Sequence, residues 1–210
     1  MPRISPATVI FDVGNVLMTF DGRRFSRIFT DTEADAQLLY AALFDRPEWS
    51  LLDAGAISHD TMRRIAEAAL PERLHPNLRA CMDHWHEHSE PLGAVNDLAA
   101  RLKERGMGVY LLTNANDRIE RLLHRTPAWP LADGWVASAF EHVMKPDPSI
   151  YKLLCERYDL NPANCLFVDD SADNCRGAEV IGMSTFHFTG MADGDVDGNA
   201  AALERTIDAL

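Results

Sequence analysis

The sequence predicts an α/β protein in which a doubly wound parallel sheet carries a small inserted helical module. Three observations support this fold class: four short apolar runs lack in/out alternation, helical patterns separate most of them, and one long stretch near the N-terminus is helical only. Continuous apolar runs are typical of parallel strands covered by helices on both faces, and such sheets form doubly wound domains. The expected strands are Thr8 to Phe11, Val109 to Leu112, Cys165 to Val168 and Ser184 to Phe188.

Two helices of the expected sheet domain have clear ends in the sequence. A helical apolar pattern runs between Pro91 and Gly106, and Gly106 lies where a C-terminal cap is expected. The pair Asp147-Pro148 should begin the next helix, because Asp is a good N-cap and Pro suits the first helical position. The pair Asn161-Pro162 should end it before the third strand.

The C-terminal segment is expected to be less regular. Residues Gly190 to Gly198 are rich in Gly and Asp, which predicts a mobile surface loop. A last short helix is expected from Ala200 to Leu210.

The domain organisation follows from the helix-only stretch between Arg23 and His88. It contains three or four helical segments, for example Ala34 to Phe44 and Thr61 to Leu70, and no convincing strand. We therefore expect residues 21–88 to form a helical cap, and residues 1–20 together with 89–210 to form the sheet domain.

Length and charge limit the classes of function. A chain of 210 residues with 47% hydrophobic composition can form one good core and a small accessory domain. Its net charge of -12 would repel nucleic acids and anionic membranes. No apolar run is long enough for a membrane helix, and the N-terminus lacks a secretory signal pattern, so we expect a cytoplasmic protein. The sequence does not distinguish a monomer from a small homo-oligomer.

The four cysteines are expected to be reduced and packed in the interior. Cys81, Cys155, Cys165 and Cys175 form no C-x-x-C pair and mostly have apolar neighbours. A cysteine metal site is the less favoured alternative.

Polar residues follow three of the expected strands. Asp12 follows the first, Thr113-Asn114 follows the second and Asp169-Asp170 follows the third. Ligands of open parallel sheets bind at the carboxyl ends of the strands, so these residues should converge on one site. Each of them alone is more often the N-cap of the next helix, and only their convergence indicates a site.

The chemistry of these residues predicts a metal-assisted phosphate site. Three neighbouring carboxylates would repel one another unless a hard cation bound them. Magnesium fits best, because it is typically held by one or two carboxylates, waters and a substrate phosphate. Lys145 can offset the remaining charge and hold a phosphoryl oxygen, with Thr113 and Asn114 on other oxygens.

Four ordered motifs resemble those of the haloacid-dehalogenase-like hydrolase superfamily. They are Asp12-Val13-Gly14-Asn15-Val16-Leu17, Leu112-Thr113-Asn114, Lys145-Pro146-Asp147-Pro148 and Phe167-Val168-Asp169-Asp170-Ser171-Ala172-Asp173-Asn174. The Asp-x-Gly-Asn opening is similar to that of a sugar-phosphatase subgroup that includes α-D-glucose-1-phosphate phosphatase. The resemblance implies a Rossmann-like core, a helical cap after the first strand and a phospho-aspartyl intermediate.

The resemblance also implies roles for individual residues. Asp12 would be the nucleophile and a magnesium ligand, and the carbonyl of Gly14 a second ligand. Asp170 would bind the metal directly and Asp169 through water, although the sequence alone does not rank the two. The transferring phosphoryl group would be bound by Thr113, Asn114 and Lys145.

One position departs from the family pattern. Most phosphatases of the superfamily carry a general acid two residues after the nucleophile, where this chain has Gly14. Such an acid usually contributes ~100-fold or more to the rate. Either the leaving group needs little help or a cap residue supplies the proton, or else the protein only binds phosphorylated ligands. The first interpretation is favoured, because a binding module needs no nucleophile.

The cap holds a histidine cluster and three further residues of interest. His84, His86 and His88 could form a zinc site, but they lack the H-E-x-x-H order and an evident third ligand, which favours a solvated hinge helix. A histidine that reaches the leaving group is a further hypothesis. Arg46, Trp49 and Trp85 could line the cap side of the pocket, where an aromatic face could stack on a sugar ring, but ordinary cap packing is the favoured interpretation.

The sequence therefore predicts a magnesium-dependent phosphatase that acts on a small phosphorylated metabolite, for example a sugar phosphate. Two alternatives remain open: a noncatalytic or weakly active phosphosugar-binding regulator, and a haloacid dehalogenase. The paired acids Asp169-Asp170 disfavour the dehalogenase, since halide displacement needs no metal site.

Overall fold

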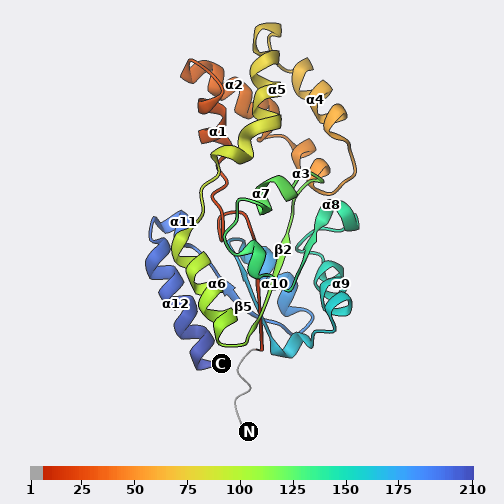
Figure 1. Cartoon of the computed structure of the whole chain (residues 1–210). Helices are drawn as coiled ribbons and strands as arrows, with labels where there is room; N and C mark the ends of the chain where they lie inside the picture. The colour runs from red at the N-terminus through yellow and green to blue at the C-terminus, as the bar shows by residue number, and fades with distance from the viewer. Residues whose placement is uncertain (1–6) are drawn as a thin grey trace.

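The computed structural model describes residues 7–210 and contains a five-stranded parallel sheet (Figure 1). Its strand order is β3-β2-β1-β4-β5, with β1 in the centre. The strands are β1 (Thr8–Phe11), β2 (Gly108–Thr113), β3 (Gly134–Ala137), β4 (Cys165–Asp169) and β5 (Ser184–His187). The predicted doubly wound, Rossmann-like α/β fold is confirmed.

Helices cover both faces of the sheet, which explains why its central strands are apolar throughout. On one face, α6 (Gly93–Glu104) and α12 (Val196–Ala209) pack on Val9 and Phe11 of β1. On the other face, α9 (Pro148–Tyr158) and α10 (Ala172–Glu179) pack on Ile10 of β1 and on Phe167. Figure 1 shows the two helix layers on either side of the sheet. Because successive strand side chains point to opposite faces, both sets must be apolar.

Short helices lie in the segments between the strands and after the last strand. They are α7 (Glu120–Leu123), η3 (Trp129–Leu131), α8 (Ser138–Glu141), η4 (Pro162–Asn164) and α11 (Gly190–Asp193). The predicted helix ends are confirmed at two places. Gly106 has φ +80 after the end of α6, and the Asp147 side chain accepts a hydrogen bond from Ser149 N at 2.8 Å at the start of α9.

A helical lobe follows β1 and lies at the top of Figure 1, and it has its own apolar cluster. It consists of α1 (Gly22–Ile28), α2 (Glu33–Leu43), α3 (Pro47–Asp53), α4 (His59–Ala68), η1 (Glu72–Leu74), α5 (His75–His84) and η2 (Trp85–His88). Phe25, Leu39, Leu43, Met62 and Leu78 are fully buried in its interior. We refer to this lobe as the cap.

Two chain segments join the cap to the sheet domain, and they lie side by side. Thr19 N donates to Glu90 O at 2.8 Å, and Ser89 Oγ donates to Thr19 O at 2.6 Å. A bridge between Met18 and Pro91 continues this antiparallel pairing. The cap is therefore connected through one paired hinge.

The structure corrects two expectations about secondary structure. The edge strand β3 was not predicted, because its sequence Gly-Trp-Val-Ala is short and only half of it is buried. The loop predicted for Gly190 to Gly198 is wrong: α11 occupies its first half, and α12 begins at Val196. Asp195 accepts a hydrogen bond from Gly198 N at 2.9 Å, so the acidic residues of this segment include a helix cap.

The four cysteines are packed in the interior as predicted, and they form no disulfide with one another. Within residues 7–210, no helix is both long and apolar enough to cross a membrane.

Candidate active site

The three polar strand ends converge as predicted, at the edge of the sheet that faces the cap. β1 lies between β2 and β4, so Asp12, Thr113 and Asp169 come from neighbouring strands. A cavity of about 260 Å³ opens between this edge and the cap. Its lining includes most of the predicted site residues, namely Asp12, Gly14, Thr113, Asn114, Lys145 and Asp170.

Three carboxylates form a compact acidic cluster at the base of this cavity. One oxygen from each of Asp12, Asp169 and Asp170 lies within 4.8 Å of the other two, which is close enough to share a cation. Oδ1 of Asp12 is buried, and its charged neighbour is Lys145 Nζ at 2.8 Å. Three carboxylates that share a single lysine keep an excess of negative charge, which fits a hard divalent cation.

The two acids after β4 differ in how fully they are already bonded. Asp169 is completely buried; its Oδ1 accepts from Ser171 N at 2.8 Å and Asn174 Nδ2 at 2.9 Å, and its Oδ2 accepts from Lys145 Nζ at 2.6 Å. Asp170 is half-buried, and its Oδ2 accepts from Asn15 Nδ2 at 3.2 Å. Asp170 therefore has more free oxygen lone pairs to offer a cation than Asp169 has.

Lys145 is buried between two of the acids. Its Nζ lies 2.8 Å from Asp12 Oδ1 and 2.6 Å from Asp169 Oδ2, and it donates to Leu112 O at 3.0 Å. One ammonium group thus has three oxygen neighbours, which matches its three N–H donors. The lysine partly neutralises the acidic cluster and is held in one orientation.

The backbone of Lys145 is fixed by Asn114. Asn114 Nδ2 donates to Lys145 O, and Lys145 N donates to Asn114 Oδ1, both at 2.9 Å. A Cβ on Gly177 of α10 would overlap the carbonyl oxygen of Pro146, so the glycine allows α10 to pack directly on this segment. The Lys145-Pro146 segment is therefore held by backbone contacts as well as by the ion pairs of Lys145.

Burial and charge perturb the acids of the site. Burial raises the pKa of Asp12 to about 7; Lys145 opposes this shift, whereas Asp169 and Asp170 add to it. Burial and the neighbouring Asp169 also raise the pKa of Asp170. Burial alone would lower the pKa of Lys145, but Asp12 and Asp169 raise it above its usual value. A bound divalent cation would stabilise the carboxylates and oppose the rise at Asp12.

Gly14 lies in the loop after β1 and lines the cavity. A Cβ at this position would meet only Phe20 Cβ, at the ordinary distance of 3.8 Å. Space therefore does not exclude a side chain where related phosphatases carry their acid. The next residue, Asn15, has φ 56 and directs its amide to Asp170.

The interpretation of Trp49 and Trp85 as ordinary cap packing is incomplete. Both pack against the apolar cluster of the cap, and both also line the cavity with Phe20. The Phe20 and Trp85 rings meet edge to face with centroids 5.3 Å apart. Arg46 pairs with Glu48 instead, in agreement with the expectation for it. The roof of the cavity is therefore aromatic.

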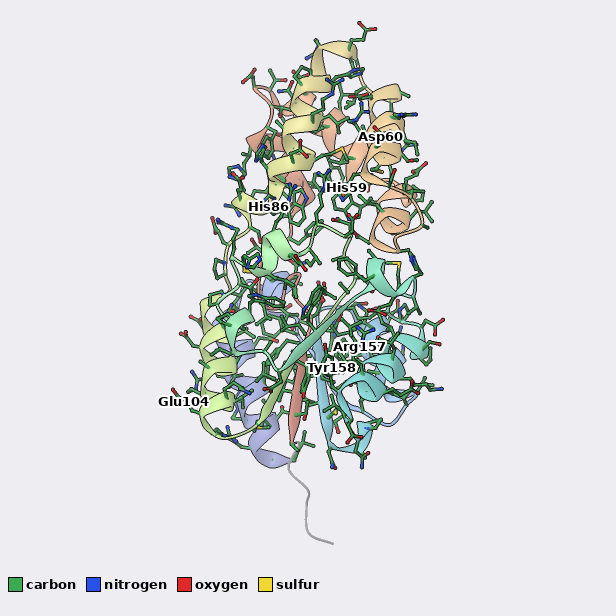
Figure 2. The ribbon with its side chains drawn as sticks, turned by 45° about the vertical axis from the view of Figure 1, so that its right-hand side comes forward. His59, Asp60, His86, Glu104, Arg157 and Tyr158 are labelled. Atoms are coloured by element: carbon green, nitrogen blue, oxygen red, sulfur yellow. The ribbon has the colours of Figure 1, made fainter. Side chains whose placement is uncertain are left out.

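Only one residue of the histidine cluster reaches the cavity. His86 lines it, whereas His84 pairs with Glu87 at 2.8 Å and His88 packs on Phe29. Figure 2 shows His86 and a second cavity histidine, His59, in the cap. The three clustered histidines do not converge on a common point, which argues against a zinc site.

Several cavity residues were not found from the sequence. They are Asp53 and His59 of the cap, and Asn116, Arg118 and Arg121 after β2. Asp53 and His59 lie in helices without a motif, so only the fold of the cap reveals them. Asn116 could have been suspected, because it lies two residues after Asn114 at the end of a strand.

The fold and the site define a hydrolase with a cap over a parallel sheet. The family model of the haloacid dehalogenase-like hydrolases matches residues 6–182, and the chain belongs to this family. This confirms the resemblance found in the four motifs.

Individual relatives include a phosphatase and a dehalogenase. The chain is 29% identical to a sesquiterpene phosphatase of Aspergillus oryzae over 86% of this chain and 88% of the relative. It is 33% identical to (S)-2-haloacid dehalogenase 1 of a Pseudomonas species, over 50% of this chain and 46% of the relative.

A solved structure shares the fold. It is a family enzyme of Bacteroides thetaiotaomicron in complex with magnesium and inorganic phosphate, with a TM-score of 0.63 and 21% identity. The match covers 85% of this chain and 92% of that one.

Proposed function

We propose that this protein is a magnesium-dependent phosphatase that hydrolyses a small phosphate monoester through a phospho-aspartyl intermediate on Asp12. The observation that carries the proposal is the buried carboxylate of Asp12, which is paired with Lys145 and lies beside two further acids at the base of a cavity. A cavity lined by a nucleophile and convergent polar groups is the usual form of such a site.

The acidic cluster supports magnesium as the cofactor. Asp12, Asp170 and the carbonyl of Gly14 would bind Mg²⁺ directly. Asp169 would act through a water, because both of its carboxylate oxygens already accept hydrogen bonds. The bound ion would supply positive charge to the phosphoryl oxygens and to the ionised form of Asp12. The magnesium and phosphate in the Bacteroides enzyme are consistent with this proposal.

The chain's own residues would carry out a two-step displacement. A carboxylate oxygen of Asp12 attacks phosphorus, and the ester oxygen leaves with the alcohol. Lys145 and the Thr113 hydroxyl bind the phosphoryl oxygens, and Asn114 keeps Lys145 in position. Water then attacks the phospho-aspartate and releases phosphate. Preformed positions for these groups account for most of the catalysis expected in phosphoryl transfer.

Two classes of alcohol fit the aromatic roof of the cavity. A sugar ring can stack on Trp49 or Trp85, which agrees with the motif resemblance to sugar phosphatases. An apolar terpene alcohol would pack on the same rings, as the name of the Aspergillus relative suggests. The substrate proposed is therefore a small metabolite, and the net charge of -12 disfavours nucleic acid.

A screen of phosphate esters tests the proposal. Glucose 1-phosphate, other sugar phosphates, farnesyl phosphate, nucleotides and p-nitrophenyl phosphate are each incubated with Mg²⁺ or with EDTA. We expect Mg²⁺-dependent release of phosphate by the wild type and a loss of ~100-fold or more in Asp12→Asn, because an amide cannot act as the nucleophile. Turnover that persists in EDTA or in Asp12→Asn would exclude the mechanism.

A haloacid dehalogenase is the second candidate, since dehalogenases are among the relatives. The same screen includes L-2-chloropropionate, with chloride release as the readout. The acidic pair after β4 favours the phosphatase, because displacement of halide requires no cation. A protein that binds sugar phosphates without turning over any ester would instead be a regulator.

A further inference from the structure

We propose that Asp53 of the cap is the general acid and base of the reaction, in place of the carboxyl that Gly14 lacks. This inference rests on the proposed phosphatase function. Among the described residues, the carboxylates that line the cavity are Asp12, Asp170 and Asp53. The first is the proposed nucleophile and the second a proposed metal ligand, which leaves Asp53 to exchange protons with the leaving group.

Asp53 is fastened to the loop that carries the phosphate-binding residues. Its Oδ1 accepts from Asn116 Nδ2 at 3.3 Å, and the buried Asn116 follows Thr113 and Asn114. Its carbonyl oxygen accepts from Ser138 Oγ at 2.5 Å, and the same hydroxyl accepts from Ala115 N at 2.9 Å. The side chain of Asp53 is therefore tied to the loop that follows β2, and its carbonyl oxygen is tied to the first residue of α8.

The chain after Asp53 makes a close contact with the sheet domain. Gly55 has φ +67, and a Cβ there would overlap the carbonyl oxygen of Ala139 at the start of α8. A glycine is required for both reasons, namely the left-handed backbone and the absence of space. This contact brings the C-terminal end of α3 down to the edge of the sheet, where Asp53 meets the cavity.

The environment of Asp53 suits proton transfer near neutral pH. Burial raises its pKa to about 7, and hydrogen bonds from Asn116 and Trp49 oppose the rise. An acid is most effective when its pKa lies near the working pH, because both protonation states are then accessible. The other ionisable groups that line the cavity are Asp12, Asp170, Lys145, His59, His86, Arg118 and Arg121.

The two cavity histidines are less suitable as the acid. Burial lowers the pKa of His59, with Arg118 adding to the effect, and burial also lowers the pKa of His86. Both are therefore largely neutral at pH 7, and His59 Nε2 already lies 2.9 Å from Asp117 Oδ1. Figure 2 shows both histidines in the cap.

Asp53 would complete the proton balance of both steps. In the first step, the bond from Asp12 to phosphorus forms, the ester bond breaks, and the Asp53 carboxyl gives its proton to the departing alkoxide. In the second step, the Asp53 carboxylate takes a proton from the attacking water. The bond from water oxygen to phosphorus forms as the phospho-aspartate bond breaks, which regenerates Asp12 and the protonated Asp53.

The test compares kcat/KM for esters whose leaving groups differ in basicity. The wild type and Asp53→Asn are assayed with p-nitrophenyl phosphate, whose phenolate leaves unaided, and with an alkyl phosphate, whose alkoxide needs a proton. We expect Asp53→Asn to lose ~100-fold or more in kcat/KM with the alkyl ester but less than ~10-fold with the aryl ester. A burst of p-nitrophenol is also expected, because hydrolysis of the phospho-aspartate becomes slow. An equal loss with both esters, or no loss, would overturn the assignment.

Two further variants sharpen the test. Asp60→Asn removes a cap carboxylate that pairs with Arg63 and Arg64 outside this cavity (Figure 2), and both esters should turn over as in the wild type. The double variant Asp53→Asn/Gly14→Asp places a carboxyl where related phosphatases carry theirs, and it should recover part of the alkyl ester activity. If Asp53→Asn does not fold, Asp53→Glu replaces it. A shift in the alkaline limb of its pH profile of kcat/KM, relative to the wild type, then supports the assignment, and an unchanged limb contradicts it.

The outcome separates this inference from the proposed function. Absence of Asp12-dependent turnover in the wild type would refute the phosphatase itself. Normal turnover with the same leaving-group dependence in wild type and Asp53→Asn would refute only the role of Asp53.

Discussion

The ion pairs of Lys145 give the most quantitative prediction about stability. In Lys145→Met, a side chain of similar length without charge would leave Asp12 and Asp169 side by side in the interior. The lysine side chain is 1% exposed, and the two carboxylates are 10% and 0% exposed. Removal of one partner from a buried ion pair costs about 3–5 kcal/mol, because the remaining charge is neither paired nor solvated. We expect a loss of this size in the free energy of unfolding at pH 7.5.

Urea denaturation in EDTA, followed by circular dichroism, measures this loss. Lys103→Met is the matched control: Lys103 Nζ also lies 2.6 Å from an aspartate, Asp133, but the side chains are 30% and 36% exposed. An exposed pair of this kind contributes roughly 0–1 kcal/mol. Excess Mg²⁺ should restore part of the stability of Lys145→Met, since a cation can replace the missing charge. A similar loss in both variants would refute the argument from burial.

Two further predictions concern packing and pH. Gly177→Ala should destabilise the protein by about 1–3 kcal/mol and lower kcat, because the added Cβ would displace the carbonyl of Pro146 next to Lys145. The control is Gly93→Ala, which should change neither stability nor kcat, because Gly93 has open space around it. Equal kcat in the two variants would contradict the prediction. In EDTA, Asp12→Asn should gain stability over the wild type as pH rises. The folded pKa of Asp12 is raised to about 7 from a usual value near ~4, so the folded wild type loses stability as pH rises between these values. Urea denaturation at pH 5.5 and 7.5 measures the difference, and an advantage that shrinks with pH would contradict the assignment.

The sheet could be predicted from sequence because burial on both faces leaves a strong apolar signal. β1 and β4 are the clearest cases, since they are central and completely buried. The edge strand β3 is paired on one side only, and its first two residues are half-buried, so its sequence carries little of that signal. The helix that replaces the predicted loop at Gly190 to Gly198 shows that acidic residues and glycines also serve as helix caps.

The base of the site could be predicted because its residues come directly from strand ends. Asp12, Thr113 and Asp169 are placed by the sheet alone, and sheet topology is readable in the sequence. The cap side could not be predicted in this way. Asp53 and Trp49 reach the cavity through the packing of α3 and α8, which depends on the contact of Gly55 with Ala139. Long-range packing of this kind has no local sequence pattern.

The paired hydrogen bonds between Asn114 and Lys145 give the two parts of the site, the phosphate-binding base and the cap, different entropic costs of binding. The amide of Asn114 pairs with the backbone of Lys145 as a neighbouring strand would, so the lysine is ordered when the protein folds. The entropic cost of fixing its long side chain is therefore included in folding, and binding of a phosphate does not incur it. The alcohol part of a substrate meets the cap, which is connected to the sheet domain through one paired hinge. Affinity for phosphate itself should thus be common to many esters, and discrimination among them would depend on the fit of the cap.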